Sequence, residues 1–501
     1  MLNNLLKSDG DSSKVKKTIA LSLASGLSTL MSVIFQMITA RYLSTTDVAV
    51  FRQTFLVYTT ISPFLLLGIP SGIYYTFARN EKRIRAVVLE SFIVLSSTSF
   101  LFTAFILLGG NRLLAYLFSN PSLESTSYLL GPYSFFMMMV SLSTPVLVYL
   151  KRINFNAKYH AFRTLFCVGI TVLCVYIYKT ATSGIYSNVF SNIVASLVIC
   201  LATLYVLPKD DYIVRKSSIS SMLKISIPIG ISAMLGTLDT YLDKWIVSIM
   251  MNPEEYAIFS TGAHEIPLIG ALTSAVTTVV LVDMTTAAKE RKFEEALHLF
   301  KSASKKTSLI VLPIMCFLAV SAMPFIGFLY TDRYIGAIDV FRVYLLYLPV
   351  RTVFYGPIMI ALGRSKQILI RSIIEIIANA ILSIIFIKLF SSVGASIATI
   401  VSVYFVSIPI NLAVISKDLK VKWHQLLPFN HYFKCLIFAL PGTVLTFVAE
   451  MIMNRMECGY LLRFVVEAIV FFTITFFIYM RVFRIPVNMY LKKIRISLKK
   501  K

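Results

Sequence analysis

Ionisable side chains inside long apolar stretches are the residues of this sequence best suited to chemistry. Asp239 and Asp243 are four positions apart in one such stretch, so they share a face if the stretch is helical. Two carboxylates that are close together in a low dielectric repel each other, and such a pair can hold a proton or share Na⁺. The adjacent Lys244 offers the alternative that the acids belong to structural ion pairs. The spacing therefore indicates either ion coupling or structural pairing.

A histidine and a glutamate, His264 and Glu265, are adjacent in the next apolar stretch. Adjacent positions on a helix do not face each other, so each side chain needs its own partner. A proton relay is one interpretation of this pair, and packing hydrogen bonds are the other.

Three arginines in apolar stretches, Arg52, Arg342 and Arg351, are candidates for binding an anion. The planar guanidinium group binds phosphate through paired hydrogen bonds. Arg342 and Arg351 diverge by roughly 180° on an ideal helix, although Pro349 between them would kink it. We favour Arg52 and Arg351 as ligands. Salt bridges within the membrane are the alternative for all three, and Arg342 is the most suited to extend to the membrane interface.

The elements that must position these side chains are transmembrane helices. The chain has 501 residues, of which 57% are hydrophobic and 14% charged, whereas soluble domains carry about 25% charged residues. A spanning helix needs ~20 mostly apolar residues. Segments of this kind occur at 18–42, 50–78, 86–109, 128–150, 160–179, 184–207, 223–250, 257–284, 307–330, 340–362, 368–389, 393–416, 431–453 and 461–482. We therefore expect an all-α, polytopic membrane protein with about fourteen transmembrane helices.

Lysine and arginine are concentrated in every second loop between these segments and in both termini. Because cytoplasmic loops are enriched in these residues, the pattern predicts a multi-pass protein with both termini in the cytoplasm. The net charge of +24 is spread over these short clusters. It does not form one basic domain, so we expect no nucleic-acid partner.

Motifs for metal, disulfide or nucleotide chemistry are missing from the sequence. The six cysteines form no CxxC pair, and most of them lie in apolar stretches, which predicts packing roles and no metal site. The phosphate-binding pattern GxxxxGK[ST] is also missing, so we expect no ATP hydrolysis and no cofactor.

An internal repeat relates two parts of the chain at an offset of 208 residues. Residues 43–51 align with 251–259, and an acidic residue, alanine, an aliphatic residue and phenylalanine recur in register. Parallel repeats of this kind occur in transporters, with the substrate between the halves. We predict two pseudo-symmetric six-helix bundles, 1–207 and 208–416, followed by two additional transmembrane helices and a basic tail in 417–501.

Several short motifs resemble those of the polysaccharide (Wzx-type O-antigen) flippases, which belong to the multidrug/oligosaccharidyl-lipid/polysaccharide exporter superfamily. The first span and its loop contribute Thr39-Ala40-Arg41-Tyr42-Leu43-Ser44 with Asp47, and the second span Leu67-Gly68-Ile69-Pro70-Ser71-Gly72. Later spans contribute Tyr241-Leu242-Asp243-Lys244-Trp245-Ile246 and Ala361-Leu362-Gly363-Arg364-Ser365-Lys366. The usual Gly-x-Tyr after the acidic loop residue is replaced by Ala49-Val50-Phe51 and Ala257-Ile258-Phe259.

This resemblance implies a flippase that moves an undecaprenyl-pyrophosphate-linked oligosaccharide, an O-antigen or capsular repeat unit, from the cytoplasmic to the outer leaflet by alternating access. Arg52 and Arg351 would bind the pyrophosphate, with Arg342 and Lys244 as further cations. Tyr74 and Tyr347 would stack on sugar rings, although most aromatic residues in such a chain face lipid. H⁺ or Na⁺ would be the coupling ion. The expected partners are the lipid-linked substrate, membrane lipids and polysaccharide-assembly proteins, in a bacterial inner membrane.

Two alternatives remain open from the sequence. A cation-coupled multidrug antiporter of the same superfamily would have twelve spans and more acids in its cavity. A polysaccharide polymerase or ligase would carry a large extracytoplasmic loop with catalytic residues, and the loops on that side are all short here. We therefore expect a transporter and not an enzyme.

Overall fold

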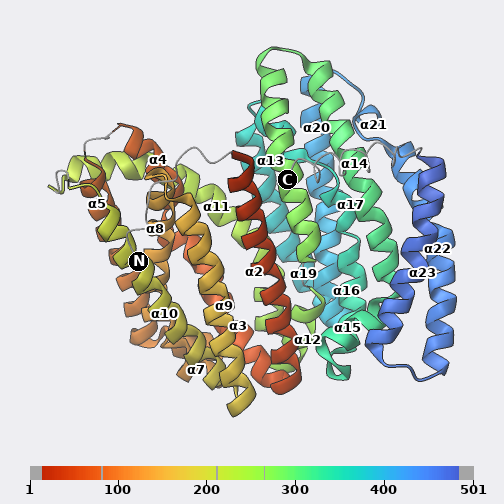
Figure 1. Ribbon diagram of the computed structural model, residues 1–501, viewed down its shortest axis with the longest axis horizontal. Coiled ribbons are helices and arrows are strands. Elements are labelled where there is room, and N and C mark those ends of the chain that lie inside the picture. Colours follow the sequence, from red (N-terminus) through yellow and green to blue (C-terminus); the bar gives the residue numbers. More distant parts are fainter. Residues whose placement is uncertain (1–13, 80–82, 210–212, 264–265, 484–501) are drawn as a thin grey trace. The chain divides into compact units, whose positions relative to one another are not determined.

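The computed structural model describes residues 14–79, 83–209, 213–263 and 266–483, and these residues form helices and short connections, with no strand among them (Figure 1). The first part of the chain forms α2 (Lys14–Tyr42), α3 (Thr45–Leu66), α4 (Ile69–Arg79), α5 (Ile84–Phe105), α6 (Asn111–Leu117), α7 (Ser122–Ser127), α8 (Leu130–Tyr149), α9 (Ile153–Tyr178), α10 (Ala181–Val206), α11 (Lys216–Met250) and α12 (Pro253–Gly262). The second part forms α13 (Pro267–Lys289), α14 (Phe293–Val320), α15 (Ala322–Tyr330), α16 (Ala337–Leu345), α17 (Leu348–Arg351), α18 (Tyr355–Ala361), α19 (Ser365–Ser402), α20 (Ile408–Leu419), α21 (Trp423–Leu426), α22 (Phe429–Arg455) and α23 (Tyr460–Val482).

Twelve segments among the described residues are long and apolar enough to cross a membrane. One of them, Ser365–Leu419, is 55 residues long and is broken by non-helical backbone at Phe390 and Ser391, so it supplies two spans. The first predicted span, 18–42, lies within the helix α2. The all-helical, multi-pass architecture predicted from the sequence is thereby confirmed.

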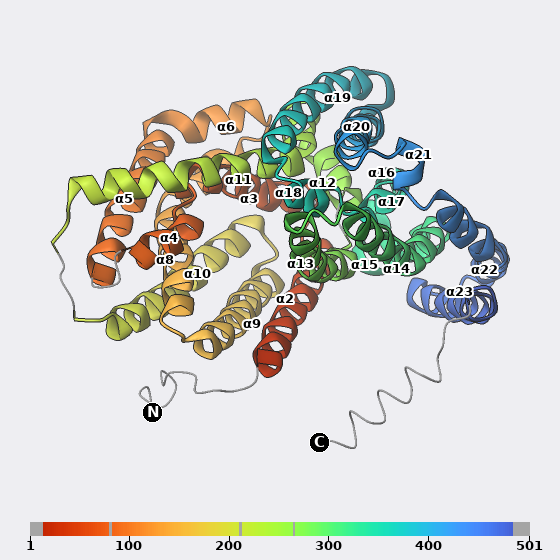
Figure 2. The same ribbon diagram turned by 90° about the horizontal axis from the view of Figure 1, so that it is seen from above.

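The chain forms two compact units. The first contains residues 1–271, 329–337 and 366–409, and the second contains 272–328, 338–365 and 410–501. In the first unit, α9 packs against α2 and α10, α8 packs against α5 and α10, and α3 packs against α11 and α12 (Figure 2). Its core includes Phe102, Phe118, Leu123 and Ile185. The predicted division into two six-helix bundles, 1–207 and 208–416, stays a prediction.

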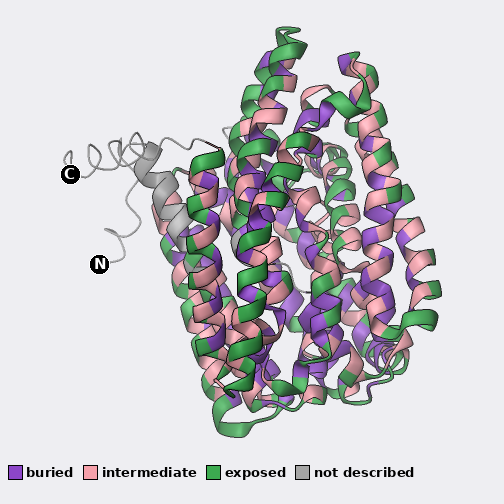
Figure 3. Cartoon of the chain, turned by 90° about the vertical axis from the view of Figure 1, so that its right-hand side faces the viewer, coloured by how far each residue is buried: buried purple, intermediate pink, exposed green. Residues whose placement is uncertain are grey.

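In the second unit, α22 packs against α14 and α23. Buried and exposed residues alternate along the helices, which gives many of them an inward and an outward face (Figure 3). The outward face of α22 is apolar, and Leu440, Val444, Phe447 and Met451 are each about half exposed there. Large apolar side chains at helical spacing on an outer surface fit contact with lipid.

The second predicted span is divided into α3 and α4 by a tight break. Leu67 ends α3 in the left-handed conformation, and Gly68 follows with φ of +70°. A Cβ atom on Gly68 would lie 2.2 Å from the carbonyl oxygen of Ser226 in α11. Glycine therefore permits both the backbone turn and the close approach of α11 to the break.

The internal repeat appears in the way that α3 and α12 begin. The side chain of Ser44 accepts a hydrogen bond from the backbone N–H of Asp47 at 3.0 Å. At the positions 208 residues later, the side chain of Asn252 accepts one from the N–H of Glu255 at 2.9 Å. Both helices thus start with a polar N-cap and an acid three residues on, an arrangement that stabilises a helix N-terminus.

Candidate functional site

A cavity of about 480 Å³ lies within the first unit, between α2, α3, α8, α10, α11 and α12. Its wall combines hydroxyl and amide groups with aromatic rings. It is lined by Ser32, Phe35, Gln36, Thr39, Val48, Phe51, Arg52, Phe55, Leu56, Thr59, Tyr133, Asn188, Tyr241, Lys244, Tyr256 and Ser260. A mostly apolar pocket with a few converging polar groups is the usual form of a binding site for an organic ligand.

Arg52 is fixed in this wall by α12. Its Nη1 atom donates to the carbonyl oxygen of Ala257 at 3.0 Å, to Oγ of Ser260 at 2.8 Å and to Oγ1 of Thr261 at 2.6 Å. All three bonds use the same nitrogen, so Nε and Nη2 have no partner among the described residues. The guanidinium is therefore held in place and keeps donors for a ligand.

Arg52 and Ser260 are separated by the offset of the predicted repeat. They are 208 positions apart, which is the offset of the internal repeat, so they occupy equivalent positions in the two halves. Equivalent positions contact each other only near the axis that relates two repeats. The contact joins α3 to α12 at these two positions; a place for Arg52 near the axis of the predicted repeat, where transporters built from parallel repeats bind their substrates, stays a prediction.

Lys244 is the second charged residue of the cavity wall. Its Nζ atom lies 5.0 Å from the ring centroid of Tyr241, one turn earlier on α11. Arg52 and Lys244 are both basic, and the other residues that line the cavity are neutral. The chemistry of the wall therefore suits an anionic ligand.

Aromatic rings form one side of the cavity wall. The ring centroids of Phe35 and Phe51 are 5.3 Å apart, those of Phe51 and Phe55 are 4.9 Å apart, and those of Phe55 and Tyr133 are 5.4 Å apart. These contacts fall in the range of favourable aromatic pairs. The rings hold one another in place and leave a rigid apolar surface beside the two cations.

A third cation lies behind this wall. Arg163 lies near the start of the predicted span 160–179, and the structure places it in α9, ten residues after the helix begins. Its Nε and Nη2 atoms donate to Oδ1 of Asn192 at 3.1 and 2.7 Å, and its charge acts on the cavity residue Tyr133. Its half-buried position could not be recognised from the sequence because the apolar stretch alone does not say where α9 begins.

Asp239 and Asp243 both lie on α11, four positions apart, and their charges are close enough to interact; that the pair binds an ion stays a prediction. Asp243 is 5% exposed and also interacts with Lys244 and Tyr256. Asp239 interacts with Glu375 of α19, a residue that sequence analysis had not placed at the site. Glu375 is itself bound to Arg371 at 2.6 Å. Asp239 and Glu375 carry like charges, so their interaction is repulsive, and Arg371 offsets the charge of Glu375.

The other predicted residues lie elsewhere. Arg351 and Tyr347 form a pair in the second unit, with the guanidinium carbon 5.0 Å from the ring centroid. Arg342, in the same unit, donates from Nε to the carbonyl oxygen of Ala319 at 3.1 Å. Tyr74 is 38% exposed on α4 and is not among the residues that line the cavity. His264 and Glu265 lie outside the described residues.

A family model described as "Polysaccharide biosynthesis protein" matches residues 20–339 of the chain. The chain belongs to the polysaccharide biosynthesis protein family. The matched segment includes α3, α11 and α12, and with them Arg52, Asp239, Asp243 and Lys244. No curated protein matches the chain by sequence.

Solved structures show the fold of this polysaccharide biosynthesis family member. The lipid II flippase MurJ in an inward closed conformation is similar over 93% of this chain and 99% of its own, with 17% identity and a TM-score of 0.74. An inward-facing multidrug resistance MATE family transporter of the MOP superfamily is similar over 78% of this chain and 96% of its own, with 17% identity and a TM-score of 0.60. A MOP superfamily transporter from Pyrococcus furiosus is similar over 84% of this chain and 99% of its own, with 16% identity and a TM-score of 0.55. The chain therefore has the fold of this superfamily.

Proposed function

We propose that the protein is a flippase that moves an undecaprenyl-pyrophosphate-linked oligosaccharide from the cytoplasmic to the outer leaflet of a bacterial inner membrane. The observation that carries this proposal is the cavity of the first unit, in which the charged wall residues, Arg52 and Lys244, are both basic. A pyrophosphate group needs cations when it leaves water, and guanidinium and ammonium groups supply them. The family match and the flippase fold support the same class of substrate.

The wall offers distinct groups to the two parts of such a substrate. Arg52 keeps free donors for the phosphates because its three bonds to α12 use Nη1 alone. Hydroxyl and amide groups such as those of Thr59, Asn188 and Ser260 can exchange hydrogen bonds with sugar hydroxyls. Arg351 and Tyr347 offer a second cation–aromatic pair, and we retain them, with Arg342 and Tyr74, as further candidate ligands.

Coupling to H⁺ or Na⁺ is assigned to Asp239 and Asp243, with His264 and Glu265 as further candidates. Carboxylates that interact within a membrane helix are costly when they are ionised and unpaired, which favours binding of a cation. Asp239 also repels the like charge of Glu375 on α19, and a cation bound between α11 and α19 would relieve that repulsion.

Deletion of the gene followed by analysis of lipid-linked intermediates tests the proposal. We expect undecaprenyl-linked glycan to accumulate in the cytoplasmic leaflet, and wild-type protein to restore export. Arg351→Ala and Asp243→Asn should each reduce export at unchanged membrane levels of the protein. Full complementation by either variant would remove that residue from the site. Unchanged glycans in the deletion strain would contradict the flippase assignment.

A cation-coupled multidrug antiporter is the second candidate, because MATE transporters share the fold. The basic wall of the cavity disfavours the cationic drugs that such an antiporter would carry. Altered drug tolerance with unchanged lipid-linked glycans in the deletion strain would favour this candidate. The same set of experiments would address the identity of the glycan and any contact with polysaccharide-assembly proteins.

A further inference from the structure

A buried carboxylate without a hydrogen-bond donor lies in the second unit, where α23 packs against α14 and α22. Glu467 of α23 is 0% exposed, and neither of its side-chain oxygens accepts a hydrogen bond of ordinary geometry from the described residues. The carboxylate of Glu450 in α22 and the hydroxyl of Ser321, which directly follows α14, are its polar neighbours. An ionised carboxylate needs donors when it leaves water, so the charge state of Glu467 requires an explanation.

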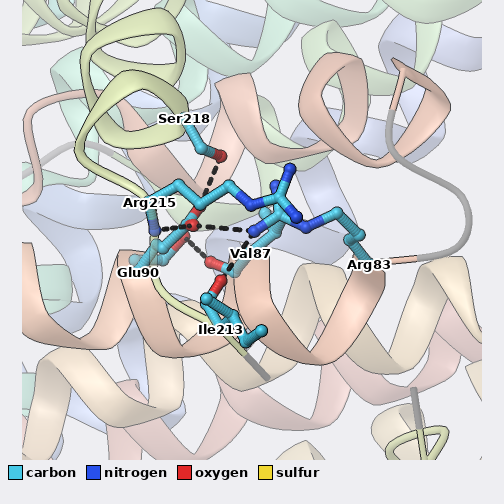
Figure 4. A network of polar contacts seen from close by, with 7 residues as sticks. Arg83, Val87, Glu90, Ile213, Arg215 and Ser218 are labelled. Carbon is cyan, nitrogen blue, oxygen red and sulfur yellow. Dashed lines mark hydrogen bonds and ion pairs between the residues drawn. The ribbon is translucent and has the colours of Figure 1, made fainter. Parts of the chain in front are cut away.

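Another buried carboxylate, in the first unit, shows what such a group needs in order to stay charged. Glu90 of α5 is also 0% exposed, but its Oε1 atom accepts a hydrogen bond from the backbone N–H of Arg215 at 3.0 Å and lies 3.4 Å from Nη2 of Arg83 (Figure 4). Its Oε2 atom accepts a hydrogen bond from the hydroxyl of Ser218. Three donors, one of them a guanidinium group, therefore surround Glu90, whereas the described residues offer Glu467 no such bond.

The arginine next to Glu467 is already bound to the other acid. Arg463, one turn earlier on α23, donates from Nε to Oε2 of Glu450 at 3.1 Å and from Nη2 to Oε1 of the same carboxylate. Its Nη1 atom donates to Oδ1 of Asn454 at 3.0 Å. A bidentate pair of this kind neutralises one carboxylate. Glu467 is therefore a second acid beside a single cation.

The helices packed around Glu467 add aromatic rings and no further formal charge. The ring of Phe317 in α14 lies 5.1 to 5.5 Å, between centroids, from three rings of α23, those of Phe464, Phe471 and Phe472. No Lys, Arg, His, Asp or Glu occurs in α15 or in residues 307–320 of α14. The charged groups that face Glu467 from these elements are Glu450 and Arg463. If both acids were ionised, two negative charges would face one positive charge in an apolar interior, which is costly.

Glu450 connects this interior to the surface of the protein. Its side chain is 14% exposed, and it lies five residues before the end of α22. In the topology predicted from the sequence, this end of α22 faces the extracytoplasmic side. A proton can therefore reach Glu467 from that side, and return to water there, by way of Glu450.

We propose that Glu467 and Glu450 together bind one exchangeable proton, so that α22 and α23 form a proton-binding site outside the predicted repeat. A protonated Glu467 has an O–H donor for the carboxylate of Glu450, and two adjacent carboxylates can share one proton in this way. A metal cation would lie next to the positive charge of Arg463 and would need several more oxygen ligands, so it fits this site less well. The proposal rests neither on the transported substrate nor on the acids of α11.

The test is infrared difference spectroscopy of the full-length protein in detergent, because the C=O stretch of a protonated carboxyl group is separate from the bands of ionised carboxylates. Glu467→Gln keeps the shape of the protonated side chain and removes the proton. Glu450→Gln removes the other acid and leaves Arg463 as the partner of Glu467. Glu457→Gln is the matched control, since this exposed residue lies in the turn between α22 and α23.

We expect Glu467→Gln to lose the intensity of one protonated carboxyl group per molecule relative to the wild type. Glu450→Gln should lose the same intensity, because one acid then remains for one guanidinium group. The control should keep the full intensity, and the wild-type band should shift in D₂O because the proton exchanges.

Four results would overturn the proposal. The first is a full band in Glu467→Gln or an equal loss in Glu457→Gln, and the second is a full band in Glu450→Gln, which would show that the two acids do not share the proton. The third is a wild-type band that does not shift in D₂O. The fourth is thermal stabilisation of the wild type by Na⁺ relative to choline at equal ionic strength that is lost in Glu467→Gln, because it would assign the site to a metal cation.

Discussion

Replacing Arg52 with glutamine removes one of the two charges of the cavity wall and keeps a polar side chain at that position. A hydrogen bond to a charged group contributes about 1.5–3 kcal/mol, so we expect a pyrophosphate-bearing ligand to bind roughly tenfold to a hundredfold more weakly. The stability cost should be smaller, about 1 kcal/mol. The hydroxyls of Ser260 and Thr261 also donate to the carbonyl oxygen of Ala257, at 3.2 and 2.8 Å, so they keep a partner in the variant.

The assay is the affinity of purified protein for an isoprenyl pyrophosphate, together with complementation of the deletion strain. Two further variants define the origin of the effect. Ser260→Ala removes one of the three bonds that hold Arg52 and keeps the charge, so it should weaken binding less than about tenfold. Arg112→Gln makes the same charge change on an exposed side chain paired with Glu124, and it should bind as the wild type does.

Wild-type affinity in the Arg52→Gln protein would refute the assignment of this cavity to an anionic ligand. An equal loss in Arg112→Gln would show that overall charge, and not the cavity, determines binding. A fall in thermal stability that exceeds the loss in affinity would assign Arg52 to the packing of α3 against α12.

Two predictions concern stability in detergent, and both are read from thermal unfolding. Gly68→Ala should lower the free energy of unfolding by about 2–4 kcal/mol, because a Cβ there would clash with α11 in addition to the strained φ. Gly109 has φ of +118° and open space around it, so Gly109→Ala should lower the free energy of unfolding by only about 1–2 kcal/mol. Equal losses in the two variants would contradict the clash. Arg463→Met should lower the free energy of unfolding by about 3–5 kcal/mol, because the variant leaves Glu450 without its cationic partner in the interior of the second unit. Arg455→Met, at an exposed end of α22, should change little, and a similarly small effect of Arg463→Met would show that the pair contributes nothing.

The helical spans could be predicted from the sequence because they follow from local properties. An apolar stretch long enough to cross a bilayer must form a helix, since no water is present to satisfy its backbone groups. The N-caps Ser44 and Asn252, each followed by an acid three residues later, are likewise local signals. Arg52 and Ser260 are also separated by 208 residues, but this spacing by itself does not predict a contact.

The composition of the site was predicted only in part. Arg52, Lys244, Asp239 and Asp243 were recognised because charge within an apolar stretch is costly and calls for a partner. Arg163 was not recognised as a residue near the site, since the position of the α9 side chains depends on the packing of this helix against α2 and α10. The aromatic side of the cavity gave no signal, because aromatic residues are abundant throughout the chain.

The sequence by itself determined the class of the protein, the helical spans and the short set of ionisable residues that lie within apolar stretches and therefore need a partner. Hydrophobicity, helix length and capping act over neighbouring residues, so they can be followed along the chain. Only the tertiary structure decided which of those charges face a common cavity, which are bound to a helix 208 residues away, and which lie in the other unit. That outcome depends on how helices distant in sequence pack, and the packing fixes the direction of each helix face.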